Sequence, residues 1–438
     1  MKSLVRPGSS SGLYVSTRLV ILLIGLVVVQ LFPVAANAQA FVPDHDSTVI
    51  DILPKAIVAL SVEMRLRESR IDAAGISAAG TASAATGGNA RSEGEGNQAQ
   101  NVLRQALSAY QIAITDQDPR AYGYTLTVLK RWPNETPKPP LIHILTAAVL
   151  QHGHEFQRAL QELDSALLVE PDNVQALLIK AQISLVIADY EMARQSCEAL
   201  WPLVRSEVAL NCQAQLESLT GQAQASFEAV SKRLAGGAVL NPQDSFELNT
   251  TAATIAHRLG NEHEAEHHYL SALQLSPTSG YLLVHYGSFL LEAGRPEDVL
   301  SLLRELPADS MSTELKIVQA EAMLAATPGD PALRELTAEL QAFFQAAFLR
   351  EEAPHKEYAQ YALSVLMDAQ SAMESARENW MLQKEPSDTL LLARAASASG
   401  NAVVLDDIAR WIYAAGTEDV RLAAVLSQGP APRGRIPR

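Results

Sequence analysis

The chain of 438 residues has 49 acidic and 34 basic side chains and a formal net charge of −15. An acidic chain repels phosphate backbones and anionic lipid heads, which argues against a nucleic-acid or membrane-surface role. Hydrophobic residues make up 48% of the chain but aromatic residues only 5%, so the composition favours helical cores of Leu and Ala over a strand-rich fold.

The first 38 residues have the pattern of a secretory signal peptide. Three basic residues precede the apolar stretch 19–29, and small residues at Ala36 and Ala38 follow at the spacing that a signal peptidase accepts. The alternative is a retained anchor, because the apolar run reaches about 18 residues when Gln30 is included, near the lower limit for a membrane span. Cleavage would leave 31 basic against 49 acidic residues, a net charge of −18, in a periplasmic or secreted chain without membrane insertion.

Residues 39–136 combine a lead-in with a divergent pair of helices. A helical pattern at 55–72 is followed at 73–97 by Gly, Ala, Ser and Thr without apolar periodicity, which predicts a flexible low-complexity loop. Helical patterns resume at 99–115 and 119–132. We therefore expect a first helix pair whose inner loop is stretched.

A 34-residue period organises residues 137–311. Ala159 and Ala193 are 34 residues apart, as are Ala265 and Val299, and each occupies the same place in a short helical phrase. A repeat of this length is a two-helix unit that cannot bury its apolar face alone, so it must stack on copies of itself.

The pattern of these residues resembles the tetratricopeptide repeat family. It combines the small residues with two glycines 34 residues apart, Gly260 and Gly294, and with the prolines Pro171 and Pro277, which follow the second helices. Glycine adopts a left-handed turn at little cost, and proline cannot continue a helix. The resemblance implies an all-α, right-handed solenoid of about eight helix-turn-helix repeats. The regular copies are 140–173, 174–206, 246–279 and 280–311, with a weaker copy at 208–240.

The two cysteines, Cys197 and Cys212, fall in the second helix of one repeat and the first helix of the next. These helices are packed neighbours in such a stack, and an exported compartment is oxidising, so we predict a disulfide. The alternative is a pair of buried thiols, because free cysteine behaves as a small hydrophobe.

Residues 263–267 read HEAEH and match HExxH, in which two histidines bind zinc and the glutamate acts as general base. A zinc peptidase is therefore the enzymatic alternative. Ala265 is also the small residue of the repeat, which places His263 and His267 on the outer face, where we expect a solvated polar surface. Weak metal binding by His263, His267 and His268 is a further alternative. The sequence has no other catalytic motif, so we predict neither an enzyme nor a cofactor.

After residue 311 the helical patterns continue through 312–427 at irregular spacing, which we interpret as degenerate repeats. The last residues, 428–438, are rich in Pro and Arg and predict a disordered tail.

The inner face of the first helices predicts a groove for a peptide or a partner helix. Tyr281 and Arg258 are its expected anchors. The alternative is a groove filled by the chain's own terminal helices or by a second copy. We predict an exported scaffold that binds another protein in a cell-envelope complex, or else a structural subunit of a secretion or cytochrome-maturation complex. The predicted groove residues are Gln151, His152, Gln182, Leu185, Thr254, His257, Arg258, Tyr281, His285 and Ser288.

Overall fold

The computed structural model describes residues 89–116, 119–134, 136–237, 239–307, 311–350 and 353–428. All of them belong to one compact unit, 42–438. The predicted signal peptide, the helix at 55–72, the loop up to residue 88 and the tail at 429–438 lie outside the described residues.

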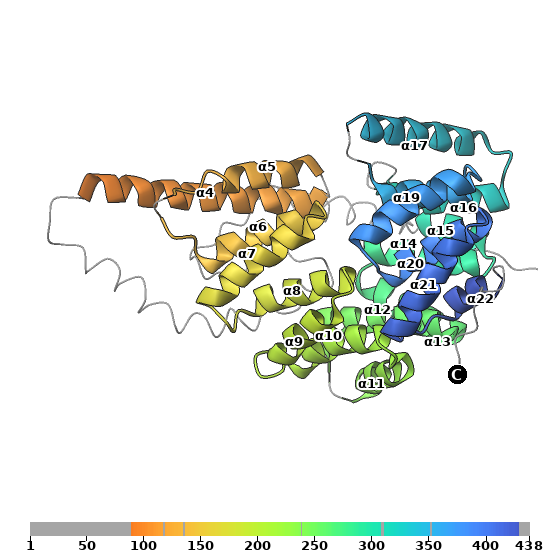
Figure 1. The fold of residues 1–438 in the computed structure, drawn as a ribbon, viewed down its shortest axis with the longest axis horizontal. Helices are drawn as coiled ribbons and strands as arrows, with labels where there is room; N and C mark the ends of the chain where they lie inside the picture. Colours follow the sequence, from red (N-terminus) through yellow and green to blue (C-terminus); the bar gives the residue numbers. More distant parts are fainter. Residues whose placement is uncertain are drawn as a thin grey trace, which may run out of the picture. The chain divides into compact units, whose positions relative to one another are not determined.

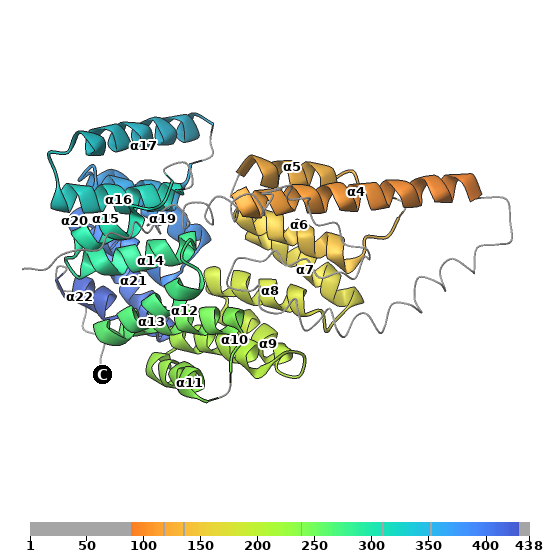
Figure 2. The same ribbon diagram turned by 180° about the vertical axis from the view of Figure 1, so that it is seen from behind.

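The regular structure of the described residues is helical throughout (Figures 1 and 2). Helices α4 to α21 form nine consecutive pairs, against about eight expected, and α22 follows them. The pairs are α4 (Asn89–Asp116) with α5 (Pro119–Leu129), α6 (Pro140–His152) with α7 (Phe156–Val169), α8 (Val174–Val186) with α9 (Tyr190–Leu200), α10 (Ser206–Leu219) with α11 (Ala223–Ala235), α12 (Pro242–Leu259) with α13 (Glu262–Leu275), α14 (Gly280–Glu292) with α15 (Pro296–Leu303), α16 (Thr313–Ala326) with α17 (Pro331–Leu349), α18 (His355–Ser364) with α19 (Ala369–Leu382), and α20 (Pro386–Ala398) with α21 (Ala402–Ala415); α22 is Val420–Gln428.

The structure confirms the 34-residue period. Ala159, Ala193, Ala265 and Val299 lie in the second helices of their pairs, and all four are completely buried. A small side chain at this point allows the two helices of a pair to approach closely, and the rest of the core packs around the crossing.

The turns between paired helices from α6 to α15 share one backbone geometry, with a residue in the left-handed conformation. Gly260 and Gly294 have φ of 75° and 70°, the left-handed conformation predicted for them. His154 and Ala188 have φ of 56° and 61° at the equivalent positions of earlier pairs, although they carry a Cβ. Each of these four residues lies five residues before the small residue of its repeat. The turn geometry is therefore conserved within the chain where glycine is not.

The same register continues beyond residue 311. Met367 and Gly400 have φ of 56° and 71°, and the residues five positions later, Ala372 and Leu405, are buried in α19 and α21. Helices α18 to α21 are thus built on the same turn-and-crossing unit, whereas the turn between α16 and α17 has no residue with positive φ.

Helix α4 begins at Asn89, so residues 89–97 are helical and the prediction of a loop there is wrong. The later part of α4 buries Val102, Ala106 and Tyr110 against its neighbours, which fixes the helix. Extending an existing helix costs far less than nucleating one, so polar residues preceding this packed part can join it.

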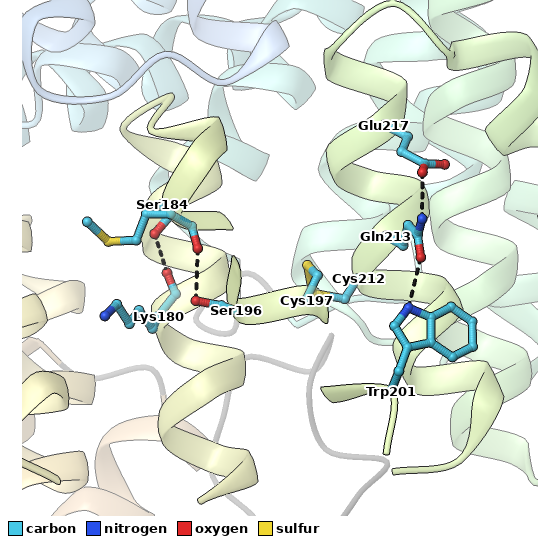
Figure 3. The surroundings of a disulfide bond; sticks show 9 residues. Lys180, Ser184, Ser196, Cys197, Trp201, Cys212, Gln213 and Glu217 are labelled. Atoms are coloured by element: carbon cyan, nitrogen blue, oxygen red, sulfur yellow. Dashed lines mark hydrogen bonds between the residues drawn. A yellow bond between two sulfur atoms is a disulfide. The ribbon is translucent and has the colours of Figure 1, made fainter. Parts of the chain in front are cut away.

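The predicted disulfide is confirmed: Cys197 of α9 and Cys212 of α10 are bonded, with their Cα atoms 5.6 Å apart. Beside them, Trp201 Nε1 donates to Gln213 Oε1 at 2.9 Å, and Gln213 Nε2 donates to Glu217 Oε1 at 2.6 Å (Figure 3). The bond links the second helix of one pair to the first helix of the next.

Candidate functional site

The HEAEH segment lies on the outer surface of α13. The side chain of His263 is 88% exposed and its Nδ1 lies 3.1 Å from Glu264 Oε1, while Ala265 between the histidines is buried. His267 is exposed as well. In the described part of the chain, no three His, Cys, Asp or Glu side chains gather where they could hold a metal ion.

His268 does not share this outer face, which argues against the weak metal site of His263, His267 and His268. It is buried, and its Nδ1 lies 2.9 Å from Asn249 Oδ1 of α12. One residue along a helix turns the side chain by about 100°, which carries it from the exposed face to the partner helix. Burial lowers the pKa of His268, with a further contribution from His267.

Eight of the ten predicted groove side chains line a single cavity of about 610 Å³. They come from the first helices of three pairs, α8, α12 and α14. They are Gln182, Leu185, Thr254, His257, Arg258, Tyr281, His285 and Ser288. Gln151 and His152 do not line it: the ring of His152 stacks on Tyr122 of α5 with 3.6 Å between centroids.

The opposite wall of the cavity is formed by the chain's own C-terminal helices. Lys356 and Gln360 come from α18, Leu390 and Arg394 from α20, and Arg421 from α22. Helix α22 contacts α12, and Arg394 of α20 donates to Glu292 of α14. The chain's own terminal helices therefore cover the predicted groove, as in the alternative given above, and the cavity remains between the two walls.

Residues 416–422, here called the clasp, join this C-terminal wall to the turn between α10 and α11. Thr417 Oγ1 donates to the carbonyl of Leu219 at 2.9 Å, and Glu418 Oε2 accepts from the backbone N–H of Ala223 at 2.7 Å. Gln222, the N-cap of α11, makes no side-chain cap bond. Glu418 therefore caps α11 from a distant part of the chain.

Close backbone contacts hold the clasp against the repeat turns. A Cβ at Gly416 would lie 3.4 Å from Gly221 N, and a Cβ at Gly260 would lie 3.0 Å from Val420 Cγ2. Both Gly221 and Gly260 also have positive φ. Because the turn glycines have no Cβ, the clasp can pack closely against the turns.

The carboxylate of Glu292 joins four helices inside the cavity. Arg394 Nη2 of α20 donates to it at 2.9 Å, His257 Nε2 of α12 lies 2.8 Å away, and Arg421 Nη1 of α22 donates at 3.4 Å. Burial alone would raise the pKa of Glu292, but the His257 contact and the charges of Arg421 and Arg394 hold it at about 2. Arg421 is also anchored to Asp419 by bonds of 2.7 and 3.0 Å.

Aromatic rings cover another part of the cavity. Tyr281 is 54% exposed, and its ring lies 4.3 Å from the ring of His285. Burial lowers the pKa of His285 to about 3, with Lys356 adding to the effect, so the imidazole is neutral at pH 7. Arg258, the second predicted anchor, is only 5% exposed and donates to Ser218 on the neighbouring repeat.

Three observations decide the fold. Helices are paired, and the pairs of the regular repeats recur at a 34-residue interval. A buried residue lies at the helix crossing of these repeats, five residues after a left-handed turn. The chain has the tetratricopeptide-repeat fold. Its groove differs from the predicted one in being covered. No helix of the described residues is long and apolar enough to cross a bilayer.

Comparisons with known proteins add similar structures of low sequence identity. No family model matches the chain, and no curated protein matches its sequence. PilW, a type IV pilus biogenesis factor, is 19% identical over 48% of this chain and 96% of its own, with a TM-score of 0.37. A tetratricopeptide repeat protein from Parabacteroides merdae is 12% identical over 68% of this chain and 99% of its own, with a TM-score of 0.36. Yeast Tom70 is 11% identical over 75% of this chain and 88% of its own, with a TM-score of 0.25.

Proposed function

We propose that this protein is an exported, non-catalytic scaffold that binds a segment of another protein on the inner wall of its repeats. The observation that supports this is the cavity itself, in which side chains from successive first helices face α18, α20 and α22. A wall that accommodates helices of its own chain has the shape and the polar groups to accept a helix of a partner.

The partner would take the place of the C-terminal wall. The clasp is held by a few polar bonds, among them those of Thr417 and Glu418. A typical hydrogen bond contributes about 0.5–1.5 kcal/mol net, so a local opening of the clasp lies well below global unfolding in free energy. Tyr281, the most exposed aromatic ring of the inner wall, becomes the anchor for the incoming segment.

The predicted signal peptide and the disulfide support a cell-envelope setting for this scaffold, because disulfides persist in oxidising compartments. The partner would then be a component of an envelope complex. A structural subunit of a secretion or cytochrome-maturation complex would use the same wall. The exposure of His263 and the absence of a third ligand among the described residues disfavour a zinc peptidase.

Site-specific photocross-linking in the native cell tests the proposal. A benzoylphenylalanine at Ser288 reports on the inner wall, and one at His267 reports on the outer face. We expect Ser288 to cross-link to a foreign polypeptide, more strongly when Thr417→Val and Glu418→Gln release the clasp, and less strongly with Tyr281→Ala. Adducts from His267 alone, or none from Ser288 in the released variant, would exclude the inner wall as the binding surface.

A further inference from the structure

A buried arginine on the cavity wall lacks an ionic partner. The guanidinium of Arg258 donates to the carbonyl of Ser218 at 2.9 Å and to its Oγ at 2.7 Å, and both acceptors are neutral. No carboxylate of the described residues forms an ion pair with it, although Asp419 is the acid that most favours its charge. Burial lowers the pKa of Arg258 to about 10. A buried charge is costly unless it is paired.

A second hydrogen-bond donor on the same wall, the hydroxyl of Tyr269, has no acceptor among the described residues. The hydroxyl of Tyr269 is buried and has no hydrogen-bond partner among the described residues, and Tyr269 lines the cavity with Arg258. Its ring is held in place by Tyr286 and Phe289, with centroids 5.5 and 5.7 Å away. Leaving a buried polar group unsatisfied costs about 1–3 kcal/mol. The described residues therefore supply no acceptor for the Tyr269 hydroxyl and no paired carboxylate for the Arg258 charge.

The acidic side chains of the cavity are already engaged. Glu292 is contacted by His257, Arg394 and Arg421. Glu321 accepts hydrogen bonds from Gln360 and Ser364. Glu314 pairs with Lys356 at 3.3 Å, and Glu385 caps α20. None of these carboxylates is left to neutralise Arg258.

Part of the cavity wall is apolar and can contact an apolar body. Ile255, Val284, Leu291 and Leu390 line it together with the exposed ring of Tyr281. Its volume of about 610 Å³ lies within the range of small-molecule sites and is too small for a partner helix of several turns.

We propose that the closed cavity binds a small organic anion, an acidic group on an apolar body, and that Arg258 and Tyr269 hold the acidic group. This goes beyond the proposed protein binding, because the ligand occupies the cavity while the clasp is closed. A ligand that binds only the closed arrangement stabilises it by mass action. The anion would then oppose entry of a protein partner.

Octanoate is the probe, with octanol and octylamine as its neutral and cationic counterparts. Calorimetric titration and thermal unfolding of the full chain should give one octanoate site and a concentration-dependent rise in melting temperature. We expect octanol to bind at least 10-fold more weakly and octylamine not to bind. Equal binding of octanoate and octanol, or several equivalent octanoate sites, would overturn the proposal.

Two variants locate the site. Arg258→Gln should abolish the preference for octanoate over octanol, and Tyr269→Phe, which removes only the hydroxyl, should weaken octanoate about 3- to 10-fold. Arg410→Gln, on an exposed side chain of α21, is the matched control and should leave binding unchanged. If Arg258→Gln does not fold, the octanoate affinity of Tyr269→Phe tests the proposal by itself. An affinity equal to that of the parent chain would overturn the proposed site. Neither result depends on the photocross-links, so the two proposals can fail separately.

Discussion

At the scale of single residues, Ala188 and Gly294 hold the same left-handed turn, with φ of 61° and 70°. The left-handed conformation destabilises the folded state by about 1–2 kcal/mol for a residue with a Cβ, so glycine is favoured there. Glycine also gives the unfolded chain more conformational freedom, which offsets about 0.4–1 kcal/mol of that gain. We expect Ala188→Gly to raise the free energy of unfolding in urea by about 0.5–1 kcal/mol. Gly294→Ala should lower it by a similar amount, because a Cβ there meets nothing within 4 Å. Shifts of the same sign for both variants would contradict the shared geometry.

Ala265 tests the register of the repeat against the HEAEH motif. It is completely buried in α13, whereas His263 and His267 on either side are exposed. Ala265→Leu should lower the free energy of unfolding by about 1–3 kcal/mol, because it overpacks the crossing. His263→Ala and His267→Ala should stay within about 0.5 kcal/mol of the parent chain. An unchanged melting temperature for Ala265→Leu would refute the register.

At the scale of elements, the disulfide joins α9 to α10 across 15 residues of sequence. In the chain-entropy model, a loop of this length contributes about 3 kcal/mol. The double variant Cys197→Ala, Cys212→Ala should be less stable than the parent chain by about that amount in urea. Dithiothreitol should lower the stability of the parent chain alone. Alkylation of both thiols in the unreduced protein would show that the bond is absent.

The cap that Glu418 provides for α11 is a contact between elements 195 residues apart. Removing a helix N-cap costs about 1 kcal/mol. Glu418→Ala should therefore lower the free energy of unfolding by about that amount and speed hydrogen exchange at Ala223 and in the clasp. The control is Glu228→Ala, on the exposed surface of α11, which should change neither quantity. Faster exchange in both variants alike would argue against a specific cap.

At the scale of the whole molecule, the repeat could be predicted because its determinants are local. The interval from Gly260 to Ala265 recurs within each unit, so burial and turns follow from the sequence. The left-handed turns at His154 and Ala188 were missed because no glycine marks them, although the same interval of five residues would have located both.

No local sequence pattern predicts that the C-terminal helices cover the groove. Thr417, Glu418 and Arg421 find their partners 198, 195 and 164 residues earlier, and no repeat relates the two regions. The inner faces of α8, α12 and α14 could therefore be predicted from the sequence. The C-terminal helices that lie opposite them could not. His152 was misplaced for a similar reason, since its stacking partner Tyr122 belongs to the divergent first pair.

We expect closure of the groove to depend on pH through Glu292, whose side chain is 22% exposed. Burial would raise the pKa of Glu292, but His257, Arg421 and Arg394 hold it at about 2, below its ordinary value of 4.5. A depressed carboxyl pKa stabilises the fold above about pH 5, and this contribution is lost as the pH falls towards 2. A shift of this size corresponds to about 3 kcal/mol.

Glu292→Gln should therefore be less stable than the parent chain at pH 7, and the two unfolding curves should converge as the pH falls from 5 to 2. Protection of the clasp amides, measured relative to their intrinsic exchange rate at each pH, should fall over the same interval in the parent chain, because Arg394 and Arg421 lose the anion that binds them to α14. In the variant, exchange in the clasp should already be fast at pH 7. A stability difference that stays constant from pH 7 to pH 2 would mean that the Glu292 carboxylate does not hold the groove closed.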